Sequence, residues 1–91
     1  YNITPYSYRR AKEIGVEIKS STRKNKKIDV YSQSGEYITS IGDINYGDYP
    51  TYIKENGEFF ANERRRLYKI RHEKDRKIVG STGWYADNIL W

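Results

Sequence analysis

The stretch IDVYSQSGEYITSI, residues 28–41, decides the fold. Its first residues, 28–30, alternate apolar and polar side chains, and residues 37–41 are rich in strand-forming types. Between them lies Gln33-Ser34-Gly35, which is typical of a hairpin turn. Residues 16–18 alternate in the same way. The pattern predicts a three-stranded antiparallel sheet within residues 16–42. Its expected buried side is formed by Ile18, Ile28, Val30, Ile38 and Ile41.

Helix signals flank this sheet on both sides. Thr4 and Pro5 form a helix start, which predicts an N-terminal helix over residues 5–14 that stops at Gly15. A loop is expected over 42–50, and a short helical turn from 48 to 56. The longest helix signal covers 58–78, and a terminal helix is expected over 84–91 after the GSTG turn. The chain is therefore predicted to be one α+β domain, residues 1–91.

The long predicted helix carries one stripe of side chains at helical spacing. The stripe consists of Phe59, Glu63, Leu67, Ile70 and Lys74, and only its middle is strongly apolar. We expect the helix to pack Phe59 or Phe60, together with Leu67 and Ile70, on the sheet.

The composition excludes several kinds of chemistry. The chain has no cysteine and one histidine, His72, so disulfides, thiolate metal sites and histidine-rich metal sites are excluded. No glycine-rich phosphate loop is present. His72 in a charged helix is more typical of a solvated residue than of a general base, and Asp43 and Asp48 alone are weak grounds for a metal. We expect no enzymatic activity and no cofactor.

No apolar run approaches the ~20 residues that span a bilayer, and no signal peptide is visible. The chain begins at Tyr1 and not at methionine. We therefore expect a processed product or the ordered part of a longer protein.

The net charge of +5 is concentrated in residues 61–79, which hold eight basic and three acidic residues. Helical spacing predicts one basic stripe, with further candidate contacts beside it and in the loop that precedes the second strand. The stripe is Arg65, Lys69, His72 and Arg76; Arg64, Tyr68 and Arg71 run beside it, and the loop adds Arg23, Lys24, Lys26 and Lys27. Such clusters contact polyanions or acidic partners. The alternative is a solvated helix face with intrahelical ion pairs.

Ten tyrosines accompany only 36% hydrophobic residues. Tyrosine suits half-buried surfaces, so the excess indicates either association with a partner or a core that is short of Leu and Val. The candidates for an aromatic interface or core are Tyr49, Tyr52, Trp84, Tyr85 and Trp91. Trp84 and Trp91 share one face of the terminal helix, which favours a helix packed on the core.

Several segments together resemble a family of proteins. They are DYPTY (48–52), RRLYKIRH (65–72), GWYAD (83–87) and ILW (89–91), with YSYRRAK (6–12) near the start. The shared pattern of the family is an aspartate-tyrosine turn, then Arg-Arg-x-x-Tyr-x-x-Arg-His, then a terminal Leu-Trp. The series resembles small basic proteins of nucleocytoplasmic large DNA viruses, the giant viruses. The resemblance covers residues 42–91 and implies a viral origin, without implying a mechanism.

A viral origin favours non-enzymatic roles for a small chain that needs a partner. We expect a structural component of the virion, a minor capsid (cement) protein that contacts other virion proteins such as the major capsid protein. It would then be found in the capsid, and in the host cell during assembly. The alternative is a basic protein that binds DNA in the viral core or during genome packaging.

Overall fold

The predicted sheet is present in the computed structural model, which describes residues 1–91. Strands β1 (Glu17–Ser20), β2 (Lys26–Tyr31) and β3 (Tyr37–Asp43) pair antiparallel in the order β1-β2-β3. Ile18 lies opposite Val30, and Ile28 lies opposite Ile41, so the apolar side chains share one face. Gly35 makes the β2–β3 turn at φ +89°, a conformation that favours glycine. The α+β fold class is confirmed.

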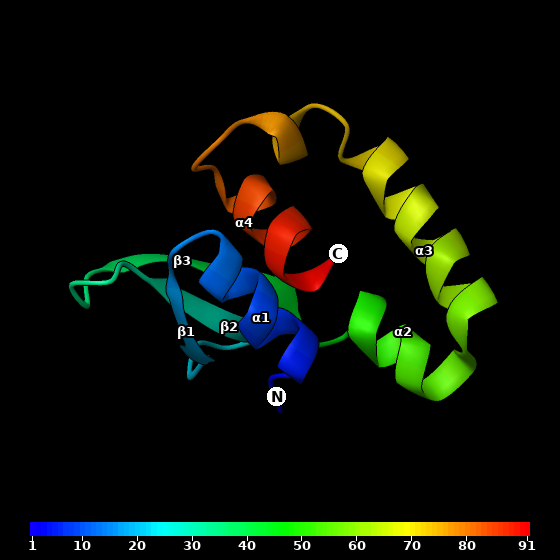
Figure 1. Ribbon diagram of the computed structural model, residues 1–91, viewed down its shortest axis with the longest axis horizontal. Helices are drawn as coiled ribbons and strands as arrows, with labels where there is room; N and C mark the ends of the chain where they lie inside the picture. The colour runs from blue at the N-terminus through cyan, green and yellow to red at the C-terminus, as the bar shows by residue number, and fades with distance from the viewer.

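Two helices cover one face of the sheet (Figure 1). Helix α1 (Pro5–Glu13) is capped by Thr4, whose Oγ1 accepts from the Ser7 amide at 3.3 Å, and helix α4 (Thr82–Leu90) is capped by Ser81. Ser7 Oγ donates to the Ile89 carbonyl at 2.8 Å and so joins the helices. The core consists of Ala11, Ile18, Ile28, Val30, Ile41, Ile89 and Leu90. The terminal helix therefore completes the core, as its sequence favoured.

One predicted core residue of the sheet is misplaced. Ile38 is 37% exposed, whereas Ile41 is buried. Side chains alternate between the two faces of a strand, so residues three apart point to opposite sides. Ile38 therefore shares its face with Ser40. On that face the hydroxyl of Ser40 donates to buried Asp29 at 2.6 Å.

Helices α2 (Tyr49–Asn56) and α3 (Glu58–Arg71) form an arm beside this core (Figure 1). They meet at one residue, Gly57, which ends α2 and begins α3 at φ +88°. Only Ala61 and Tyr68 of α3 are buried. The expected packing of the long helix on the sheet is therefore wrong, because α3 packs against α2 and turns its apolar stripe outward. Phe59, Phe60, Leu67 and Ile70 are all exposed.

Helix α3 ends at Arg71 and not, as predicted, at Ile78. His72 is its C-cap, and a 3-10 turn, η1 (Asp75–Lys77), follows. The Arg76 guanidinium folds back, and its Nε donates to the carbonyl of Lys69 at 3.2 Å. That carbonyl belongs to the last turn of the helix, where no helical amide is left to donate to it, so the side chain stabilises this end. No helix of the structure combines the length and the apolarity that a bilayer crossing requires.

A buried ion pair connects the sheet, α2 and the N-terminal segment. Lys27 Nζ and Tyr1 Oη donate to Asp48 Oδ2 at 2.8 Å and 2.6 Å, and the Thr51 amide donates to Oδ1 at 3.0 Å. Asp48 is 0% and Lys27 3% exposed. Burial by itself raises the pKa of Asp48, but the hydrogen bonds from Lys27, Tyr1 and Thr51 outweigh it and hold that pKa below its usual value.

Replacing Asp48 by Asn tests this ion pair. Asn is an equally good N-cap, so the substitution removes the charge and keeps the cap of α2. Lys27 is then left buried without a counter-ion, and we expect a loss of about 3–5 kcal/mol in the free energy of unfolding. Urea denaturation followed by circular dichroism measures it. The double variant Lys27→Met/Asp48→Asn should recover a large part of the loss. Equal stability of the single and double variants would contradict a role for the unpaired charge.

The same pair predicts a pH dependence. The folded pKa of Asp48 is depressed, so its contribution is complete above the unfolded value of about 4 and is lost as pH falls through the folded pKa. We expect the unfolding free energy to fall as pH drops from about 5 to about 2. The slope should be smaller in Asp48→Asn. Identical slopes in the two proteins would show that other carboxyl groups account for the acid sensitivity.

Candidate functional site

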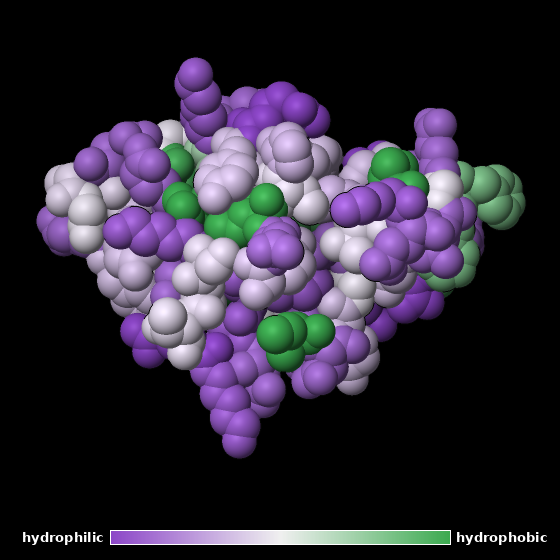
Figure 2. All heavy atoms as spheres, turned by 90° about the horizontal axis from the view of Figure 1, so that it is seen from below, coloured by the Kyte–Doolittle hydropathy of each residue, from purple (hydrophilic) through white to green (hydrophobic).

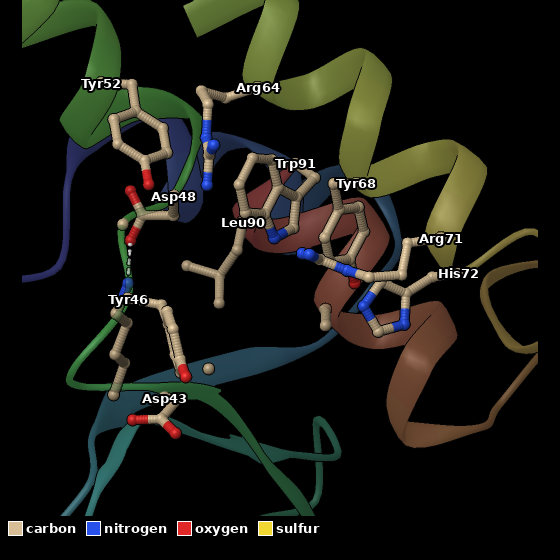
Figure 3. A pocket seen from close by; sticks show the side chains of 14 residues that line it. Asp43, Tyr46, Asp48, Tyr52, Arg64, Tyr68, Arg71, His72, Leu90 and Trp91 are labelled. Carbon is tan, nitrogen blue, oxygen red and sulfur yellow. Dashed lines mark hydrogen bonds and ion pairs between the residues drawn. The ribbon is translucent and has the colours of Figure 1, made fainter.

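A cleft of about 450 Å³ lies where α3 faces α4 and the end of β3 (Figure 3). Its polar lining includes Asp43, Tyr46, Arg64, Arg71 and His72, and its apolar lining includes Leu90 and Trp91. The volume is within the ~300–1,000 Å³ of small-molecule sites. The cleft therefore has room for a ligand or for a side chain of a partner.

Stacked aromatic rings close the cleft on its inner side. Tyr68 of α3 stacks on Trp91, with ring centroids 4.3 Å apart and planes at 10°. Tyr52 of α2 lies 6.2 Å from Trp91 and 5.3 Å from Phe60. Burial, with the nearby carboxylates of Asp87 and Asp75, raises the pKa of Tyr68 to about 12. These rings attach the α2–α3 arm to the core and keep the cleft in shape.

Two glycines make room for this arrangement. A Cβ at Gly47 would lie 2.3 Å from the ring of Tyr52, and a Cβ at Gly42 would lie 2.8 Å from Leu90. Gly42 also has φ +77°, which favours glycine. Side chains at either position would displace residues that line the cleft.

Positively charged side chains outnumber negatively charged ones in the lining of the cleft. Lys27 and Asp48 neutralise each other, which leaves Arg64, Arg71 and Asp43. No carboxylate lies within ion-pair distance of Arg64 or Arg71. Figure 3 shows both guanidinium groups pointing from α3 into the cleft, one on each side of Trp91. Arg64 also lies over the Tyr52 ring, at 5.6 Å from its centroid. The cleft is therefore suited to an anion.

The side chains of the predicted basic stripe contact other residues of the same chain. Lys69 Nζ lies 2.8 Å from Asp87, and Arg76 lies 3.1 Å from Glu73 and 3.9 Å from Asp87. His72 Nδ1 is 3.3 Å from Asp75, and the Arg65 guanidinium lies 3.7 Å from the centre of the Tyr49 ring. Because the helix ends at Arg71, Arg76 does not continue the stripe along α3. Each residue of the predicted stripe therefore contacts a carboxylate or an aromatic ring of the same chain.

The basic residues that were predicted to share the loop before the second strand, residues 23–27, lie in different environments. Lys27 lies in β2 and is buried against Asp48, not in a loop as predicted. Arg23 lies over the Tyr37 ring at 4.5 Å and 4.0 Å from Asp29. Only Lys24 and Lys26 are exposed without a pairing carboxylate. The cluster therefore does not form a continuous basic surface.

The predicted aromatic residues mainly hold the arm in place. Tyr49 packs on Tyr6 at 5.6 Å and donates its hydroxyl to Asn62 at 3.0 Å. Trp84 and Tyr85 are half-buried neighbours on α4, with ring centroids 5.0 Å apart.

Sequence reasoning missed the roles of Asp48 and Asp87. For Asp48 a signal was available, because Asp followed by Tyr-Pro is a helix N-cap pattern.

The outer face of α3 carries three exposed apolar side chains, which share it with an exposed intrahelical ion pair. Phe59 is 89%, Ile70 61% and Leu67 42% exposed. Figure 2 shows a largely hydrophilic surface with separate hydrophobic patches, one of them at the end where α2 and α3 meet. Such a stripe opposite Ala61 and Tyr68 makes α3 a helix with two apolar sides, only one of which is covered by the chain itself.

We expect Asp87 to anchor α3, because it pairs with Lys69 at 2.8 Å and its side chain is 13% exposed. Asp87→Asn should cost ~1–2 kcal/mol and speed amide exchange in residues 58–71 more than in β2 and β3. Hydrogen exchange with mass spectrometry measures this. The control is Glu63→Gln, which breaks the exposed pair with Arg66 and should leave exchange unchanged. Equal exchange in the two variants would contradict the anchoring role.

No known protein family, no curated protein and no solved structure matches the chain.

Proposed function

We propose that this protein is a non-enzymatic structural component of a large DNA virus particle, a minor capsid protein that binds other virion proteins. One observation carries the proposal: the exposed apolar stripe of α3, formed by Phe59, Leu67 and Ile70. Large exposed apolar side chains at helical spacing are typical of a helix that docks in a groove of a partner. The resemblance of residues 42–91 to giant-virus proteins supports the viral setting. The major capsid protein is the proposed partner.

The geometry also explains how such a docking helix is presented. The inner side of α3 is held by Tyr68 on Trp91 and by Lys69 on Asp87. The helix is therefore ordered before a partner arrives, and less conformational entropy is lost on binding. Aromatic and aliphatic anchors on a rigid helix are typical of interface hot spots.

Binding of nucleic acid through the basic stripe is the weaker proposal. Lys69 and Arg76 are paired with carboxylates, and Arg65 is stacked on a tyrosine ring. A polyanion would have to displace these intramolecular partners. Two other arginines, Arg64 and Arg71, have no carboxylate partner, and they line the cleft.

The proposed place in the particle has a direct test. In the virus that encodes this chain, mass spectrometry of purified, nuclease-treated particles should find the protein in the shell fraction. Absence from the particle, or presence only with the genome, would contradict the proposal.

The double variant Phe59→Ser/Ile70→Ser tests the docking surface itself. Each side chain contributes about 1.5–3 kcal/mol when buried, so we expect incorporation into particles to fall more than tenfold. Both residues are exposed in the free protein, so circular dichroism should show an unchanged fold. The matched control is Ile44→Ser/Val79→Ser, which removes apolar side chains of 52% and 77% exposure outside α3. Equal incorporation of the two variants would exclude the α3 face as the docking surface.

A further inference from the structure

We propose that the cleft behind α3 binds one nucleotide unit through its phosphate, either as a free nucleotide or within a single strand of nucleic acid. Arg64 and Arg71 would hold the phosphate, and the ring of Tyr46 would stack on the base. The site is distinct from the outer face of α3, so it stands or fails independently of the capsid proposal.

The two arginines are the first part of the argument. They are seven residues apart on α3, which is two helical turns, so both reach the same side of the helix. Most other basic side chains of residues 61–79 have a carboxylate partner, but these two have none. Guanidinium groups without a counter-ion that line one cleft are suited to a phosphate, since each donates two parallel hydrogen bonds.

Tyr46 is the second part. It lines the cleft and is 71% exposed, and none of the ring pairs of the structure includes it. Figure 3 places its side chain beside Leu90 and Asp43, on the side of the cleft opposite α3. An uncovered aromatic ring across from a pair of arginines is the arrangement by which proteins stack an unpaired base while holding its phosphate.

The shape of the cleft favours a single nucleotide over a duplex. It is bounded by α3 on one side and by α4 with Gly42 and Gly47 on the other, and its volume is about 450 Å³. A duplex presents phosphates on a wide, stiff cylinder, whereas an unpaired nucleotide inserts into a narrow site. A carboxylate of an acidic protein is the competing ligand. It carries a single charge and no ring, so it would leave one arginine and Tyr46 unused.

The test is the binding of a labelled short oligothymidylate, followed by fluorescence anisotropy at ~150 mM salt. We expect the wild-type protein to bind it and Arg64→Gln/Arg71→Gln to bind at least tenfold more weakly. The control Lys24→Gln/Lys54→Gln removes the same charge at exposed residues outside the cleft, and should change affinity less than twofold. Since the cleft contacts one phosphate of the single strand, the log–log salt slope should be about −0.7.

Competition experiments identify the ligand. Adenosine monophosphate should displace the oligothymidylate at lower concentration than inorganic phosphate does. Tyr46→Leu should remove this difference and leave phosphate competition unchanged. A free nucleotide that binds as tightly as the oligothymidylate assigns the site to nucleotides, and a tighter oligothymidylate assigns it to single strands; both support the proposal.

Three results would overturn it. The first is absence of oligothymidylate binding by the wild-type protein. The second is an equal loss in both double variants, which would reflect net charge alone. The third is a Glu-rich peptide that competes as well as the oligothymidylate, which would assign the cleft to an acidic protein.

Discussion

A single buried carboxylate, Asp48, connects parts of the chain that have little else in common. It caps α2, accepts a hydrogen bond from the hydroxyl of Tyr1 and neutralises Lys27 of the central strand. A buried charge is tolerated only when every partner is present, so this group fixes the start of α2 relative to the sheet. The position of the whole α2–α3 arm follows from that start. In a chain with a small core and no cysteine, this polar junction supplies order that apolar contacts alone would not.

The sequence predicted the sheet and the flanking helices because their signals are local. Alternation in residues 28–30, the turn at Gly35 and the cap at Thr4 are confirmed, whereas α4 begins at Thr82, two residues before the predicted start. Ile38 was assigned to the wrong face although the spacing from Ile41 was sufficient to decide it. The end of α3 was missed because Arg76 stabilises it through a tertiary contact with Lys69.

The candidate site could not be predicted from the spacing of residues in the sequence, because it depends on contacts between distant residues. Helical periodicity groups Arg65, Lys69 and His72, but it does not show that Asp87, eighteen residues beyond Lys69, neutralises part of that group. The free arginines, Arg64 and Arg71, were identified only as neighbours of the stripe. Asp87 of α4 supplies the carboxylate for Lys69, whereas most other pairs of this region form with acidic residues three or four positions away. Tyr68 is turned inward onto Trp91, which leaves Phe59 and Ile70 on the outside.

Because Gly57 alone connects α2 and α3, the orientation of α3 depends on the number of residues between the two helices. Helices α2 and α3 share this one residue, so there is no loop to absorb an insertion or a deletion. One residue more or less would rotate α3 by about 100° about its own axis. Tyr68 would leave Trp91, and the outward stripe would turn toward the arm's interior. The number of residues at this position therefore determines which side of α3 faces the rest of the molecule, even though a side chain at residue 57 would meet no other atom within 4 Å.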